Sequence, residues 1–151
     1  MHDWKNMLLA VDDTPTSRKA VQYTADIVAN LQGVRICLLH IYPEPPPDYY
    51  RQGRTLDQYR QENDARAERI FREATGLLAG RGVPAEAIRT RSRLAEQQTI
   101  SQTIMAVQAE EKAGTVVVGK RGVSKAEEFL FGSISSALIH QSRDFTVWVV
   151  G

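Results

Sequence analysis

The chain has one cysteine among its 151 residues, so no internal disulfide is available to it. This excludes the small secreted scaffolds whose folds are held together by several disulfides. Cys37 lies inside an apolar run, Val34 to Ile41. We therefore expect it to be a buried, inert thiol rather than a nucleophile.

The chain also lacks an excess of charge of either sign, because 19 Lys and Arg stand against 18 Asp and Glu, for a net charge of +1. A chain so balanced has no global basic field with which to hold nucleic acid or an anionic membrane. Its uninterrupted apolar runs extend over a few residues only, against the roughly 20 that a membrane-spanning helix needs. We therefore expect neither nucleic acid nor a membrane as a partner.

The N-terminus does not have the pattern of a secretion signal. Residues 1–6 are mostly polar, and the five apolar residues that follow are fewer than a signal peptide needs. This predicts a cytoplasmic protein. The length, with 42% hydrophobic and 25% charged residues, is typical of a globular chain and predicts a single domain over residues 1–151.

Short apolar runs predict buried strands over residues 7–11, 34–41, 115–118 and 145–150. A weaker strand is predicted over residues 87–93, where three arginines on one face alternate with Ile88, Thr90 and Ser92 on the other. Thr14-Pro15 predicts the start of the first helix, because threonine is a good N-cap and proline fits the first helical position. Gly33 predicts the end of that helix.

Further helices are predicted over residues 56–78, around Ile100, Ile104 and Val107, and over residues 133–140. Four prolines between residues 43 and 47 predict a loop over residues 42–55. Strands that alternate with helices predict the α/β class, an open parallel sheet with helices on both faces.

In such sheets, ligands bind outside the carboxyl ends of the strands. Three segments follow predicted strands: Asp12-Asp13, the chain from Ile41 onward, and the loop over residues 119–133. In that loop, Gly119 and Gly122 are expected to adopt positive φ and to let backbone N–H groups approach an anion. Gly132-Ser133 opens a helix, whose N-terminus favours phosphate.

Lys120, Arg121 and Lys125 add positive charge to this loop. The pattern predicts a phosphate-binding site made of two separated pieces. From the residues alone, a surface loop with turn glycines and an N-cap serine is an equally good interpretation. The common alternatives, G-x-x-x-x-G-K-[ST] and a G-x-G-x-x-G after the first strand, are not in the sequence.

Gly119, Gly122, Gly132 and Ser133 fit the spacing G-x2-G-x9-G-[ST], the nucleotide-binding signature of the universal stress protein family. Residues 9–12 and 38–41 also resemble the first two strands of that family. The resemblance extends from about residue 5 to residue 150. It implies a Rossmann-like, five-stranded parallel sheet in the order 3-2-1-4-5.

Members with this signature bind ATP, so the resemblance implies that this chain binds ATP, alone or with Mg²⁺ that Asp13 could approach. It places adenine at Asp12 and at the backbone of Ile41, with Ala10 beside it. It places ribose and phosphates at Val118, Gly119, Arg121 and Gly122, and it closes Gly132, Ser133 and Ile134 over the phosphate chain.

The preferred hypothesis is a cytoplasmic ATP-binding regulatory protein of the stress response, which signals through its oligomer. One alternative is a slow ATPase or autophosphorylating enzyme with Ser133 or a nearby serine as the phosphate acceptor. Because no clear general base adjoins the predicted phosphate site, no catalytic residue is assigned. Another alternative is a dimeric interaction scaffold that does not use nucleotide, against which the intact glycine spacing argues.

Neither His40 nor His140 has a second metal ligand at useful spacing, so no metal site is predicted. His40 is expected to be a core or ligand-adjacent histidine. In the order 3-2-1-4-5 the third and fifth strands are the sheet edges. Arginines protect the strand over residues 87–93 against pairing, whereas residues 145–150 carry no charge or proline. This predicts a homodimer through the strand over residues 145–150.

Overall fold

The computed structural model describes residues 2–120 and 134–151. Five parallel strands form one sheet in the order β3-β2-β1-β4-β5, which confirms the expected order. In chain order the elements are β1 (Asn6–Ala10), α1 (Pro15–Val28), β2 (Arg35–Pro43), α2 (Pro47–Arg51), α3 (Leu56–Ala79), β3 (Ile88–Ala95), α4 (Ile100–Glu111), β4 (Thr115–Gly119) and β5 (Thr146–Val150). Residues 134–141 are also helical.

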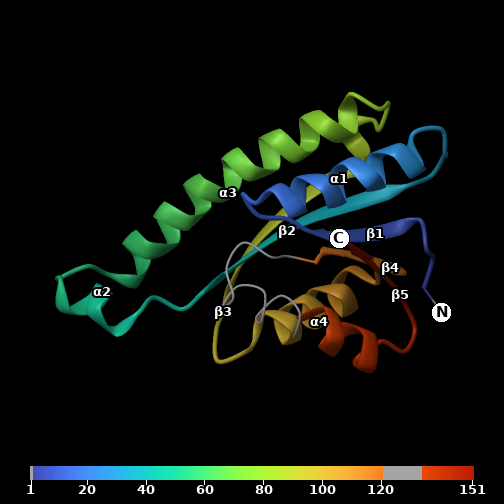
Figure 1. Cartoon of the computed structure of the whole chain (residues 1–151). Coiled ribbons are helices and arrows are strands. Elements are labelled where there is room, and N and C mark those ends of the chain that lie inside the picture. The colour runs from blue at the N-terminus through green and yellow to red at the C-terminus, as the bar shows by residue number, and fades with distance from the viewer. Residues whose placement is uncertain (1, 121–133) are drawn as a thin grey trace.

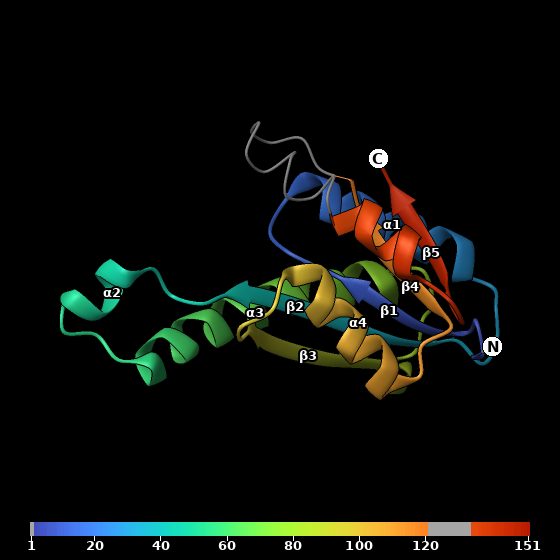
Figure 2. The ribbon, with the colours of Figure 1, turned by 90° about the horizontal axis from the view of Figure 1, so that it is seen from below.

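Helices cover both faces of the sheet, as Figures 1 and 2 show. α1 and α3 pack on one face, and α4 and the helix over residues 134–141 pack on the other. Alternate residues of β2 therefore enter different cores: Leu38 faces α1 and α3, whereas Cys37 and Leu39 face α4. Cys37 is fully buried, as expected, and burial raises the pKa of its thiol to about 11.

In the described parts of the chain, no helix has the length and apolar character that crossing a membrane would require. Apolar side chains of α1, α3, α4 and the helix over residues 134–141 pack into the two cores on either side of the sheet.

The first helix begins as predicted but ends earlier. The Thr14 side chain accepts a hydrogen bond from the Ser17 N–H, and Pro15 occupies the first helical position. The expected continuation to Gly33 is wrong, because α1 ends at Val28. Gly33 instead adopts a φ of +81° in the turn that leads into β2.

The expected loop over residues 42–55 is partly wrong. β2 continues to Pro43, and α2 forms within the segment (Pro47–Arg51). Proline is tolerated at the first turn of a helix, where its missing N–H breaks no bond, so the proline run precedes α2 rather than preventing it. Tyr49 of α2 packs edge-on against Tyr59 of α3, with ring centroids 5.1 Å apart. Figure 1 shows α2 and the start of α3 extending beyond the end of the sheet.

The N-terminal segment before β1 packs across the amino ends of the central strands; we call residues 2–5 the N-terminal strap. The Trp4 carbonyl accepts a hydrogen bond from Thr115 Oγ1 at 2.8 Å, and the Asp3 carbonyl accepts one from the Asn6 N–H at 3.0 Å. The strap passes so close to Gly114 that a Cβ there would lie 2.3 Å from the Asp3 carbonyl oxygen. Gly114 is therefore required by close backbone approach.

The three arginines of β3 pair with two carboxylates at the end of α4. Arg93 forms two hydrogen bonds with the Glu110 carboxylate, at 2.8 and 2.9 Å, and Arg91 contacts both Glu110 and Glu111. This network links an edge strand to the helix that covers it. It also leaves β3 with charged side chains along its length, which disfavours pairing with another strand.

We expect the Glu110 ion pairs to make stability depend on acid pH. Hydrogen bonds from Arg93 and Arg91 lower the pKa of Glu110 from 4.5 to about 2. A carboxylate with a depressed pKa in the folded state stabilises the protein above its unfolded pKa, and this contribution is lost as the pH falls toward 2. In urea unfolding, Glu110→Gln should lose less stability than the wild type over this range. The difference should stay below about 1 kcal/mol, since Glu110 is half-exposed. Parallel pH profiles would contradict the prediction.

Candidate functional site

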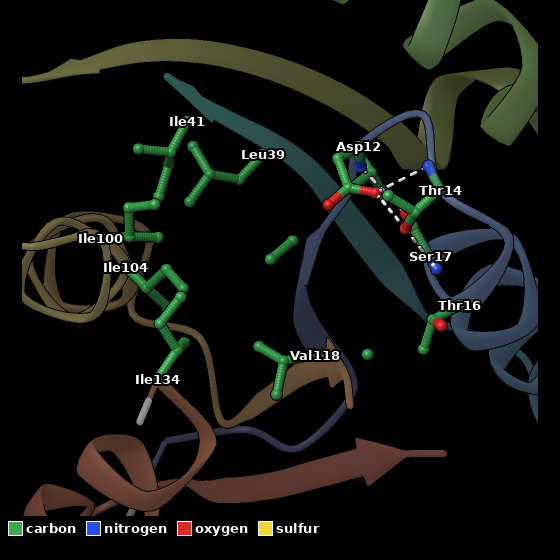
Figure 3. Close-up of a pocket in the computed structure, with 13 residues that line it drawn as sticks. Asp12, Thr14, Thr16, Ser17, Leu39, Ile41, Ile100, Ile104, Val118 and Ile134 are labelled. Atoms are coloured by element: carbon green, nitrogen blue, oxygen red, sulfur yellow. Dashed lines mark hydrogen bonds between the residues drawn. The ribbon is translucent and has the colours of Figure 1, made fainter. Parts of the chain in front are cut away.

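A recess, partly open to solvent, lies at the carboxyl ends of β1, β2 and β4. Figure 3 shows its side chains converging from the strands, from α1, from α4 and from the start of the helix over residues 134–141. The lining residues are Ala10, Val11, Asp12, Thr14, Thr16, Ser17, Leu39, Ile41, Ile100, Ile104, Val118, Gly119 and Ile134. This is the location at which open α/β sheets bind ligands, where the order of the strands reverses.

Every predicted site residue that lies in the described part of the chain lines this recess: Ala10, Asp12, Ile41, Val118, Gly119 and Ile134. They come from three strands, the loop after β1 and one helix, and they are up to 124 positions apart in the sequence. The remaining predicted residues, Arg121, Gly122, Gly132 and Ser133, lie outside the described residues.

One wall of the recess is aliphatic, and the sequence reasoning missed most of it. Ile100 and Ile104 lie one turn apart on α4, and Figure 3 shows them beside Ile41 and Ile134. In sequence these residues have the spacing of an ordinary core helix, so no signal separated them from the core. Together with Val118 they give the recess the apolar walls that small-molecule sites commonly have.

The opposite rim is polar and is built on the N-terminus of α1. The Asp12 carboxylate accepts hydrogen bonds from the Thr14 N–H, at 2.9 Å, and from the Thr14 hydroxyl. In return, Ser17 Oγ accepts one from the Asp12 N–H at 2.9 Å. These bonds, drawn in Figure 3, fix the Asp12 side chain at the edge of the recess. The positive end of the α1 dipole stabilises a carboxylate there.

Gly119 is needed for a reason other than the expected one. Its φ is not positive; among the described glycines, only Gly33, Gly53 and Gly82 have positive φ. A Cβ on Gly119 would instead lie 3.0 Å from Thr16 Cγ2 and 3.2 Å from the Thr16 carbonyl oxygen. The glycine lets the first turn of α1 approach the end of β4, which closes this side of the recess.

The described residues contain no group of three or more His, Cys, Asp or Glu side chains that could hold a metal ion. His140 is exposed on the helix over residues 134–141, whereas His40 is buried in β2. Its ring stacks near that of Tyr42, with centroids 6.4 Å apart.

The chain belongs to the universal stress protein family, whose family model matches residues 3–151. A relative from Thermus aquaticus, described as the universal stress protein in the QAH/OAS sulfhydrylase 3′ region, is 30% identical over 139 residues. That alignment covers 92% of this chain and 93% of the relative.

Solved structures share the fold. A universal stress protein in complex with cAMP aligns with a TM-score of 0.66 at 21% identity, over 96% of this chain and 95% of that chain. The universal stress protein from Archaeoglobus fulgidus in complex with dAMP aligns with a TM-score of 0.63 at 19% identity, over 96% of each chain. Both of those proteins were solved with an adenine nucleotide.

Proposed function

We propose that this chain is an ATP-binding regulatory protein of the cytoplasmic stress response, which holds the nucleotide in the recess at the carboxyl ends of its strands. The observation that carries the proposal is that all the described residues predicted to bind nucleotide line one recess. The cAMP and dAMP complexes of two structural neighbours give independent support for an adenine nucleotide as the class of ligand.

The chemistry of the recess fits each part of such a ligand. The aliphatic walls suit the faces of a purine, and Asp12 and the main chain of Ile41 offer polar groups to its edge. Val118 and Gly119 lie where β4 ends, and they lead into the segment that carries Arg121 and the remaining signature residues. In this proposal that segment contacts the ribose and phosphates.

Acid extraction of the purified protein, followed by analysis for nucleotide, is the direct test. We expect adenine nucleotide to be released, and calorimetry on the stripped protein to show binding of ATP. An extract without nucleotide, together with no binding of ATP, ADP, AMP or cAMP at millimolar concentration, would refute the proposal and favour an interaction scaffold. Incubation with γ-labelled ATP separates simple binding from hydrolysis and from autophosphorylation.

We further propose that the regulatory unit is a homodimer joined through β5. This strand ends the sheet, and its side chains are apolar on both faces: Val147 enters the α4 core, and Trp148 enters the α1 core. Trp148 also contacts Tyr23 edge-on, with centroids 6.4 Å apart, and Tyr23 is 52% exposed. A second copy paired with this edge would cover both the unpaired backbone groups of β5 and the side chain of Trp148.

The backbone hydrogen bonds between β4 and β5 identify which residue of β5 to change in a test of the dimer. Thr146 N–H donates to the Gly114 carbonyl, and the Val150 carbonyl accepts from Lys120 N–H, so these residues point their backbone groups at β4. By alternation, Val149 points its N–H at the open edge. Val149→Pro should therefore raise the Kd of the dimer about tenfold or more, through one lost hydrogen bond in each copy.

Sedimentation of the wild type and of Val149→Pro at micromolar concentration measures this effect. Val149→Thr, which keeps the N–H and the branched shape, is the matched control and should dimerise like the wild type. A monomeric wild type, or a proline variant that dimerises equally well, would show that β5 is not the interface.

A further inference from the structure

The pattern of backbone hydrogen bonds between β1 and β2 changes beside the recess. Leu9 pairs with Leu38 and Ala10 with Leu39, and the Val11 N–H continues the ladder by donating to the Leu39 carbonyl at 2.8 Å. In a parallel ladder the next rung would run from the Ile41 N–H to the Val11 carbonyl. Among the backbone hydrogen bonds of the described residues, that rung is not formed.

A side chain takes its place. His40 Nδ1 lies 3.0 Å from the Val11 carbonyl oxygen. A carbonyl oxygen can only accept, so Nδ1 carries the proton and donates it. His40 is only 6% exposed and stacks near Tyr42 with the two rings 24° apart, so its ring has little freedom to turn away.

The hydrogen bond from His40 to the Val11 carbonyl affects the backbone N–H of Ile41. Backbone groups of a strand alternate in direction, so the Ile41 N–H points toward β1, as the Leu39 carbonyl does. Both Val11 and Ile41 line the recess. With the Val11 carbonyl occupied by His40, the Ile41 N–H is turned to the recess without its ladder partner.

We propose that His40 is a positioning residue that holds the Val11 carbonyl and thereby keeps the Ile41 main-chain N–H available to a bound ligand. The ligand must present an unprotonated ring nitrogen at the edge of a flat heteroaromatic group, as a purine does. The ligand part of this inference rests on the proposed function; the backbone part does not.

Amide hydrogen exchange on the ligand-free protein tests the backbone part. In the wild type, the Ile41 amide should exchange at least about 10-fold faster than the Leu39 amide, which lies within the ladder. His40→Phe keeps the ring but removes the donor, so the Val11 carbonyl should pair with Ile41 and slow exchange there about 10-fold. His40→Asn places an amide N–H near the position of Nδ1 and should restore fast exchange. Equal protection of Ile41 and Leu39 in the wild type would overturn the proposal without need of any variant.

Calorimetry with ATP and AMP tests the ligand part. His40→Phe should weaken binding about 10-fold, and His40→Asn should recover most of it. His140→Phe makes the same change at an exposed histidine and is the matched control. If exchange behaves as expected but the wild type binds no nucleotide, the proposed function fails and the backbone inference stands. If the wild type binds and a folded His40→Phe binds equally well, the role of His40 toward the ligand is refuted.

Discussion

Replacing Ala10 with phenylalanine is expected to weaken nucleotide binding by about 100-fold or more, equivalent to roughly 2.7 kcal/mol, while the domain stays folded. Ala10 ends β1, is half-buried, and lines the recess. Leu39 and Val118 line the same recess, and a small side chain at position 10 leaves room there for the proposed ligand. A phenyl ring would enter the recess itself rather than the close-packed core, so it competes with ligand without over-packing the sheet.

Calorimetry with ATP measures the loss, and circular dichroism with urea unfolding checks the fold. Ala109→Phe is the matched control, because Ala109 is exposed on α4, away from the recess. This variant should bind like the wild type. Unchanged affinity in a folded Ala10→Phe would place the nucleotide elsewhere.

Gly114→Ala is expected to lower the free energy of unfolding by about 1–3 kcal/mol. The added Cβ would lie 2.3 Å from the Asp3 carbonyl oxygen and 2.6 Å from that of His2. These are backbone atoms of the N-terminal strap, and they cannot rotate away as a side chain would. The strap must therefore shift, which strains or breaks the hydrogen bond from Thr115 to the Trp4 carbonyl.

Gly76→Ala is the matched control for this change. Gly76 lies in α3, is exposed, and has open space around its Cβ position. Alanine there should raise stability by about 0.5–1 kcal/mol, because it is the better helix former. Urea unfolding of both variants should thus give shifts of opposite sign. A Gly114→Ala protein as stable as the wild type would mean that the strap does not hold this position.

Four of the five strands could be predicted from the sequence because each is a short apolar run between strong turn or capping signals, whereas β3 was predicted from the alternation of its arginines with other residues. Thr14-Pro15, for example, has a direct physical role at the start of α1. The wrong predictions, of the end of the first helix and of the loop over residues 42–55, came from glycine and proline, which restrict the backbone only locally. Gly33 marks a turn but not the end of a helix, and the proline run before Pro47 opens a helix as readily as it breaks one.

The residues of the candidate site were likewise predicted only in part. Asp12 and Ile41 could be placed because Asp12 follows a strand and Ile41 lies near the carboxyl end of another, and parallel strands bring their carboxyl ends to one edge. Ile100 and Ile104 could not, since an aliphatic side chain that lines a recess looks in sequence like one that fills a core. The role of Gly119 was also hidden, because the close approach of Thr16 arises from tertiary packing.

The position of β1 at the centre of the sheet has a consequence for synthesis on the ribosome. β1 pairs with β2, but its other neighbour, β4, begins only at Thr115. A nascent chain that has reached Ala95 can join β3, β2 and β1 while one edge of β1 stays open. The recess is then also unfinished, since Ile104 and Val118 have not yet been added. A ligand that needs all the walls of the recess, Ile134 included, can bind only after β4 and the helix over residues 134–141 have docked, and it would then stabilise the completed fold.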